Sequence, residues 1–217
     1  MRTFYPPRRD ITPRPRLAGE TIALAAAVGV LTGASTLLFQ EILPGAWVHL
    51  ANSGAVWVVG AFGITAWRAR DLRQAAILGL VVLVGAVVGY YGTASVIGVQ
   101  DFTAVRGPAI WSGVALVAGP VFGVAGLAYS RAPFVPRVLA MALLAGVFIG
   151  EALYLLVQFS YVPEAIITGA LGFAIPFALG RSGIERWWAA GGAGLLGAAF
   201  LGAMLVLARV VDALFLA

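Results

Sequence analysis

The chain has 217 residues, 61% of them hydrophobic and 11% charged, with a mean hydropathy of +0.98, and this composition excludes a water-soluble globular protein. Cysteine and lysine are both absent, so disulfides, thiolate metal sites and lysine-based covalent chemistry are excluded as well. The formal net charge is +5, but its arginines are grouped as in membrane proteins, so we expect an integral membrane protein without a nucleic-acid partner.

Residues 1–16 form a basic segment that is rich in proline and arginine. It contains four prolines and five arginines, and the prolines prevent it from forming a packed helix. We expect it to be a cytoplasmic tail that lies against anionic membrane lipid.

Residues 17–217 are expected to form one transmembrane domain of seven helices. Their apolar runs lie at 18–39, 47–67, 75–99, 109–129, 138–161, 164–179 and 188–208, and a spanning helix needs about 20 apolar residues. Twelve of the fourteen arginines precede the first run or follow the second, fourth and sixth. The alternate connections contain Glu41, Asp101 and Glu164 with a single arginine, Arg106. The positive-inside rule therefore predicts a cytoplasmic N-terminus and an external C-terminus in the plasma membrane.

An internal repeat is visible when the runs are taken in pairs. The first, third and fifth runs contain "GVLTGA", "GAVVGY" and "GVFIGE", and the return runs align without a gap at Ser53, Ser112 and Thr168. This pattern predicts an all-α bundle of three tandem helical hairpins plus a C-terminal helix, with the hairpins related by an axis along the membrane normal.

Glu151 is a carboxylate inside the apolar fifth run. At 1.5 Å per residue it lies about 21 Å along its helix from Arg137, in the outer half of a bilayer core about 30 Å thick. A carboxylate facing lipid is costly, so we expect Glu151 to point into the bundle, either protonated or held by hydrogen bonds. The expected partners are Tyr90, Tyr91 or Asn52, which reach a similar depth.

Two helical faces gather the other candidate residues in the outer half. On the fifth run, Glu151, Tyr154 and Gln158 are spaced i, i+3, i+7 and share one helical face. On the second run, His49, Ser53 and Trp57 recur every four residues and share another. Trp111 is assigned to the outer aromatic belt. The inner half has few polar side chains, which predicts a pocket that opens outward. The candidate ligand-binding residues are Glu151, Tyr154, Gln158, Asn52, Trp57, Tyr90, Tyr91, His49 and Ser53.

These features favour a protein that binds or transports a small molecule. One alternative is an intramembrane enzyme that acts on a lipid or isoprenoid with Glu151 as general acid. Another is a non-catalytic scaffold or interaction subunit. Of the three hypotheses, the enzyme is not favoured. His49 is the only histidine, so no metal site is predicted, and no cofactor is expected. The expected partners are membrane lipid, a small-molecule ligand and another membrane protein.

The segments "PGAWVHLANSGAVWVVGAF", "GAVVGYYGTAS", "IWSGVALVAGPVFGVAG" and "GVFIGEALYLL" resemble a family of small, multi-pass actinobacterial membrane proteins that carry a domain of unknown function. The resemblance implies location and topology and no catalytic activity. The architecture is also similar to the substrate-binding S-components of energy-coupling-factor vitamin transporters, which are compact bundles with an outward-facing pocket. The seventh helix departs from that pattern.

Overall fold

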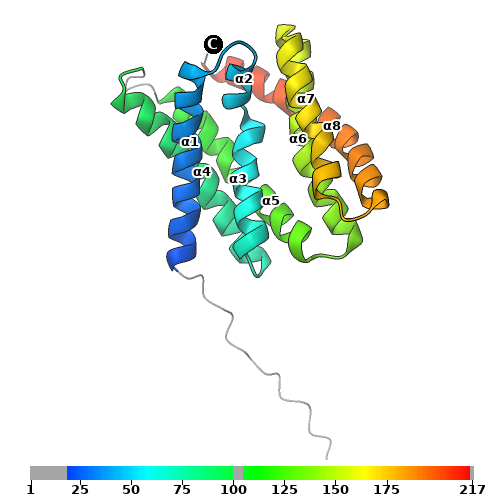
Figure 1. Ribbon diagram of the computed structural model, residues 1–217. Helices are drawn as coiled ribbons and strands as arrows, with labels where there is room; N and C mark the ends of the chain where they lie inside the picture. The colour runs from blue at the N-terminus through cyan, green and yellow to red at the C-terminus, as the bar shows by residue number, and fades with distance from the viewer. Residues whose placement is uncertain (1–18, 100–104, 216–217) are drawn as a thin grey trace, which may run out of the picture.

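The chain is helical throughout the part that the computed structural model describes, residues 19–99 and 105–215 (Figure 1). The basic tail expected at residues 1–16 lies outside these ranges. The helices are α1 Gly19–Ile42, α2 Trp47–Ala51, α3 Gly54–Arg68, α4 Leu72–Val96, α5 Arg106–Arg131, α6 Phe134–Phe159, α7 Val162–Leu179 and α8 Gly183–Phe215. Within the described ranges, six of them (α1 and α4 to α8) are long and apolar enough to cross a membrane. The predicted multi-pass helical architecture is therefore confirmed.

The expectation of seven helices is wrong, because the second apolar run is interrupted. It divides into α2 and α3 at Asn52 and Ser53, so the described residues form eight helices. Ser53 has an extended backbone (φ −80°, ψ 126°), and its hydroxyl accepts hydrogen bonds from the N–H groups of Ala55 at 3.1 Å and Val56 at 3.3 Å. Serine favours such an N-cap over a helix interior. The 15 residues of α3 extend only about 22 Å at 1.5 Å per residue, so the span needs both pieces.

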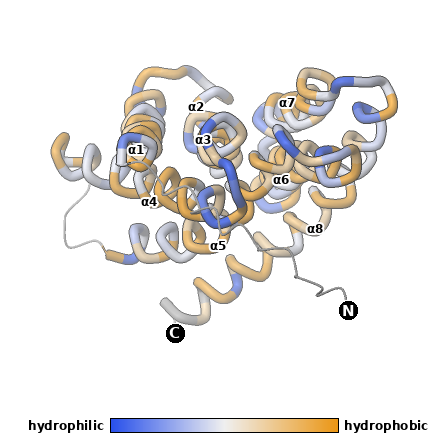
Figure 2. Tube along the Cα trace, turned by 90° about the horizontal axis from the view of Figure 1, so that it is seen from below, coloured by the Kyte–Doolittle hydropathy of each residue, from blue (hydrophilic) through white to orange (hydrophobic). Residues whose placement is uncertain are grey.

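The helices form two groups that pack side by side. Helices α1 to α5 make the first group and α6 to α8 the second, and contacts of α6 with α3 and α5, and of α7 with α2, join them (Figure 1). Viewed from the end at which α1 begins, most of the helical length is hydrophobic and the turns are hydrophilic (Figure 2). The arginines at this end, called the arginine end below, are Arg68, Arg70, Arg73, Arg131, Arg137, Arg181 and Arg186.

Glycine allows the closest helix contacts in each group. A methyl group at Gly33 of α1 would overlap the carbonyl oxygen of Ala86 in α4, and one at Gly150 of α6 would meet the carbonyl oxygen of Gly197 in α8 at 2.7 Å. Small residues let membrane helices approach in this way, because the packing gained replaces contacts with lipid. Each group thus contains one tightly packed pair of parallel helices, α1 with α4 and α6 with α8.

The glycines that suggested a repeat have different neighbours in the two groups. Gly29 of α1 and Gly85 of α4 pack against each other, whereas Gly146 of α6 packs against Leu196 and Ala193 of α8. The third hairpin therefore packs against the C-terminal helix α8, and its glycine does not make the contact that joins the first helices of the other two hairpins. An axis that relates all three hairpins stays a prediction.

Candidate functional site

Glu151 of α6 lies against the N-terminus of α3 and links the two helix groups. Its Oε2 atom accepts hydrogen bonds from the hydroxyl of Ser53 at 2.8 Å and from the N–H of Ala55 at 3.0 Å. The first turn of a helix has unpaired N–H groups and a partial positive charge, so it attracts a carboxylate. The expected bond to a neighbouring helix is present. Its donors are Ser53 and the Ala55 backbone, and not the expected tyrosines or Asn52.

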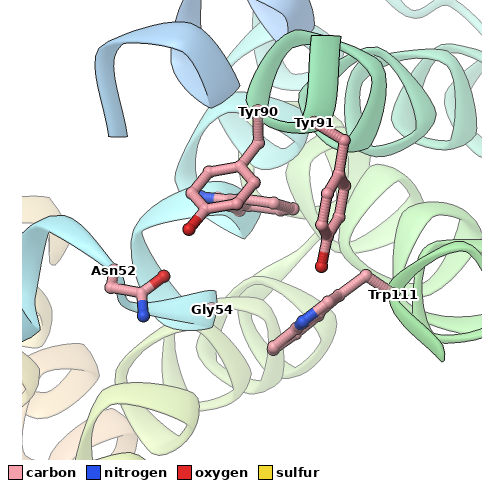
Figure 3. Close-up of a pocket in the computed structure, with 6 residues that line it drawn as sticks. Asn52, Gly54, Tyr90, Tyr91 and Trp111 are labelled. Carbon is pink, nitrogen blue, oxygen red and sulfur yellow. The ribbon is translucent and has the colours of Figure 1, made fainter. Parts of the chain in front are cut away.

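A pocket of about 120 Å³ opens beside the same helix break (Figure 3). Asn52 lies at the break and Gly54 is the first residue of α3, while α4 and α5 supply the opposite wall. Asn52 is exposed, so it forms the rim. The lining residues are Asn52, Gly54, Trp57, Tyr90, Tyr91 and Trp111.

Four aromatic rings form most of the pocket wall. The Trp57 ring centroid lies 6.0 Å from that of Tyr90 and 5.8 Å from that of Trp111, with interplanar angles of 52° and 46°. Tyr90 and Tyr91 meet edge to face at 5.0 Å and 76°. In Figure 3 the two tyrosines extend from α4 toward Trp111 and Asn52. The rings therefore contact one another and form a continuous aromatic wall around the pocket.

Hydrogen bonds to α1 hold two of these rings in place. Trp57 Nε1 donates to the hydroxyl of Thr36 at 3.0 Å, and the Tyr90 hydroxyl donates to Gln40 Oε1 at 3.4 Å. The Gln40 amide nitrogen is buried and has no hydrogen-bond partner among the described residues. A buried donor of this kind is usually satisfied by an ordered water or a ligand. This donor lies behind Tyr90, outside the six residues that line the pocket.

The remaining candidate residues lie away from the pocket lining. His49 contacts the ring of Tyr161 at 4.8 Å, and Tyr161 stacks on Phe159, which in turn meets Tyr154 edge to face at 5.7 Å. These side chains form an aromatic cluster between α2, α6 and the start of α7. Gln158 is exposed, while Ser53 is buried and bonded to Glu151. Four of the nine candidates line the pocket, namely Asn52, Trp57, Tyr90 and Tyr91.

Two lining residues, Gly54 and Trp111, are not among the sequence-derived candidates. Trp111 also fits the interfacial belt, and the signal that the sequence offered for an inward-facing side chain was the small residue Ala115 at i+4 on the same helix face. Gly54 follows "NS" and precedes a long apolar run, which is a helix-start pattern. Recognising that start would have revealed the break and therefore the opening.

A second acid, Glu185, is buried at the arginine end, within the second group. Its Oε1 accepts from Arg137 through Nε at 3.0 Å and through Nη2, and its Oε2 accepts from the Arg181 N–H at 2.9 Å. Ser182 completes the turn by accepting from the Glu185 N–H at 3.3 Å. This ion pair joins the start of α6 to the start of α8. Among the described residues no group of three histidine or acidic side chains is arranged to hold a metal ion.

The apolar spans, the interrupted second span and the pocket at its break define a multi-pass helical membrane protein. The chain belongs to a family of unknown function, DUF6518, which it matches over residues 12–210. Comparison with curated proteins and with solved structures finds no match. The family has no assigned activity, so the function has to be argued from the site.

Proposed function

We propose that this protein binds or transports a small molecule through the pocket at the α2–α3 break. The observation that carries the proposal is that the interruption of a spanning helix coincides with an aromatic pocket lined by Asn52 and Gly54. Membrane transporters commonly form their substrate sites at discontinuous helices, because the break presents backbone and side-chain polar groups inside the bilayer.

The construction of the pocket also supports binding. Trp57 and Tyr90 are each tied to α1 by a hydrogen bond, so two rings of the pocket wall are fixed in position before a ligand binds, which lowers the ordering cost of binding. Ligand sites in proteins typically combine aromatic walls with a few polar groups, and here Asn52 at the rim is such a group.

The enzymatic alternative receives less support from this geometry. A general acid must reach its substrate, but the six residues that line the pocket include no carboxylic acid, and Glu151 Oε2 is engaged by α3. Close packing at Glu151 agrees with a structural link, as a scaffold would have. The pocket is what distinguishes a binding protein from that scaffold. The likeness to S-components and the actinobacterial source stay predictions.

Native mass spectrometry of gently solubilised protein tests the proposal by detecting a retained ligand. A Cβ atom at Gly54 would lie 3.7 Å from the Trp111 ring, so Gly54→Leu projects a side chain toward the pocket. Gly63 lies on the same helix with nothing within 4 Å of such a Cβ, which makes Gly63→Leu the matched control. We expect the parent and Gly63→Leu to retain a small molecule and Gly54→Leu to lose it. Retention by Gly54→Leu, or no retained molecule in any sample, would contradict the proposal.

We further propose that the protein resides in the plasma membrane with its arginine end in the cytoplasm. Positive charge is retained on the cytoplasmic side during insertion, and all seven arginines of this end lie in or beside turns. Asp71 lies in the turn between α3 and α4 at the arginine end, and Val99 follows α4 at the opposite end. Reporter fusions at these two positions test the orientation. A cytoplasmic signal at Val99 with an external one at Asp71 would reverse it.

A further inference from the structure

We propose that the ligand of this pocket is a compact organic cation, a quaternary or methylated ammonium group. The inference rests on the proposed binding function and adds the chemical class. It derives from the nature of the walls, since four of the six lining residues are Trp57, Tyr90, Tyr91 and Trp111.

Aromatic faces attract cations because the ring quadrupole places negative charge above and below the plane. The attraction operates within about 6 Å of a ring centroid and strengthens when water is excluded. In this pocket neighbouring ring centroids are 5.0 to 6.0 Å apart, and the planes are inclined to each other by 46° to 76°. These are the spacings of rings that contact one another, so a cation lies not between a pair of rings but in the pocket that all four line, within range of more than one ring.

The helix terminus at the pocket edge does not turn the site into an anion site. Helix N-termini bind anions through free N–H groups, but the Ala55 N–H is bonded to Ser53 and Glu151, and the Val56 N–H is bonded to Ser53. The Glu151 carboxyl group thus occupies the position that an anionic ligand would take. None of the six lining residues is basic, so no lining side chain repels a cation.

The size of the pocket agrees with a small head group. An apolar cavity of roughly 150 Å³ accommodates benzene, so about 120 Å³ suits the four heavy atoms of a trimethylammonium head group, with the rest of the ligand directed toward the rim at Asn52. Asn52 at the rim offers a polar contact to a substituent such as a hydroxyl. Choline combines these features and serves as the probe.

Calorimetric titration of the purified full chain with choline and with 3,3-dimethylbutanol tests the charge directly, because the alcohol has the same shape without the positive nitrogen. We expect choline to bind about tenfold or more tightly than the alcohol. Trp111→Leu should weaken choline binding by about tenfold, while Trp188→Leu, which alters an exposed tryptophan of α8, should leave it unchanged. Thermal unfolding of each variant verifies that it is folded.

The outcomes separate the two proposals. Equal affinity for choline and the alcohol, or equal weakening by the two tryptophan variants, would overturn the cation assignment and leave a pocket that binds a neutral molecule. If neither probe binds but native mass spectrometry detects a ligand lost in Gly54→Leu, the ligand class is wrong and the binding function stands. If neither probe binds and no ligand is retained, both proposals are overturned.

Discussion

The two acids Glu151, which is half-buried, and Glu185, which is buried, are held in different ways. Glu185 is paired with the guanidinium of Arg137 and also accepts from a backbone N–H. Glu151 is held by a hydroxyl and a backbone N–H at the start of α3, from Ser53 and Ala55. One acid therefore meets a full opposite charge and the other meets only partial charges.

The location of each bond explains the difference in partner. The Glu185 pair lies within the second helix group, at the arginine end, where water is near and a guanidinium is easily accommodated. The Glu151 bond crosses between the groups at the depth of the pocket, where an arginine would be costly. A helix break supplies donors there without an ionised base. The same break therefore borders the pocket and links the two helix groups.

Removal of Arg137 should have the largest effect on stability. Arg137→Met leaves Glu185, which is 3% exposed, without its charge partner, and breaking a buried ion pair costs about 3 to 5 kcal/mol. Chemical unfolding in detergent measures this loss. The double variant Arg137→Met, Glu185→Leu should recover much of it, because no unpaired charge is left. A single variant as stable as the parent would show that the pair is not buried.

Removal of the Glu151 carboxyl group should cost less. Glu151→Leu leaves the Ser53 hydroxyl without its acceptor, while the Ala55 N–H keeps its bond to the Ser53 hydroxyl, and an unsatisfied buried donor costs about 1 to 3 kcal/mol. The same unfolding assay applies. A loss equal to that of Arg137→Met would mean that Glu151 is an ionised group paired as strongly as Glu185, and the contrast between the two acids would fail.

Ser53 provides the next smaller effect. Ser53→Ala removes the N-cap of α3, which is worth about 0.5 to 2 kcal/mol, and one of the two bonds to Glu151. In a double-mutant cycle with Glu151→Leu, the two losses should be less than additive because they remove a shared interaction. Additive losses would show that Glu151 and Ser53 do not share a hydrogen bond.

The smallest expected effect belongs to Glu151→Gln. The amide oxygen can still accept from Ser53 and Ala55, so the free energy of unfolding should change by less than about 1 kcal/mol. If binding is governed by the rings, choline affinity should also change less than in Trp111→Leu. A folded Glu151→Gln protein that loses choline binding entirely would make the acid a direct part of the ligand site.

Much of the architecture could be predicted from apolar runs, because a bilayer requires about 20 apolar residues for each span. The break at Asn52 and Ser53 was missed because the run from 47 to 67 is apolar enough to be read as one helix. The partner of Glu151 was missed for a related reason. Ser53 lies at the expected depth, but the Ala55 N–H is a donor only because a helix begins there.

The pocket was partly predictable. Tyr90 and Tyr91 were found from depth, and Asn52 and Trp57 from their positions on the second run. Trp111 was not found, because an aromatic residue near a span end fits the interfacial belt equally well, and only the contact with Trp57 identifies its role. The Glu185 network could have been suspected from Ser182 and Glu185, whose spacing resembles a capping box. Its link to Arg137 depends on the packing of α6 with α8.

Ligand protection of a single cysteine tests most directly whether the helix break is a binding site. The chain has no cysteine, so Asn52→Cys introduces one thiol at the pocket rim, and Val99→Cys provides an exposed control at the same end of the bundle. We predict that choline slows the reaction of Asn52→Cys with a trimethylammonium thiosulfonate reagent and leaves that of Val99→Cys unchanged. Equal rates with and without choline at Asn52→Cys, while choline binding is seen in the same sample, would show that the binding site lies elsewhere.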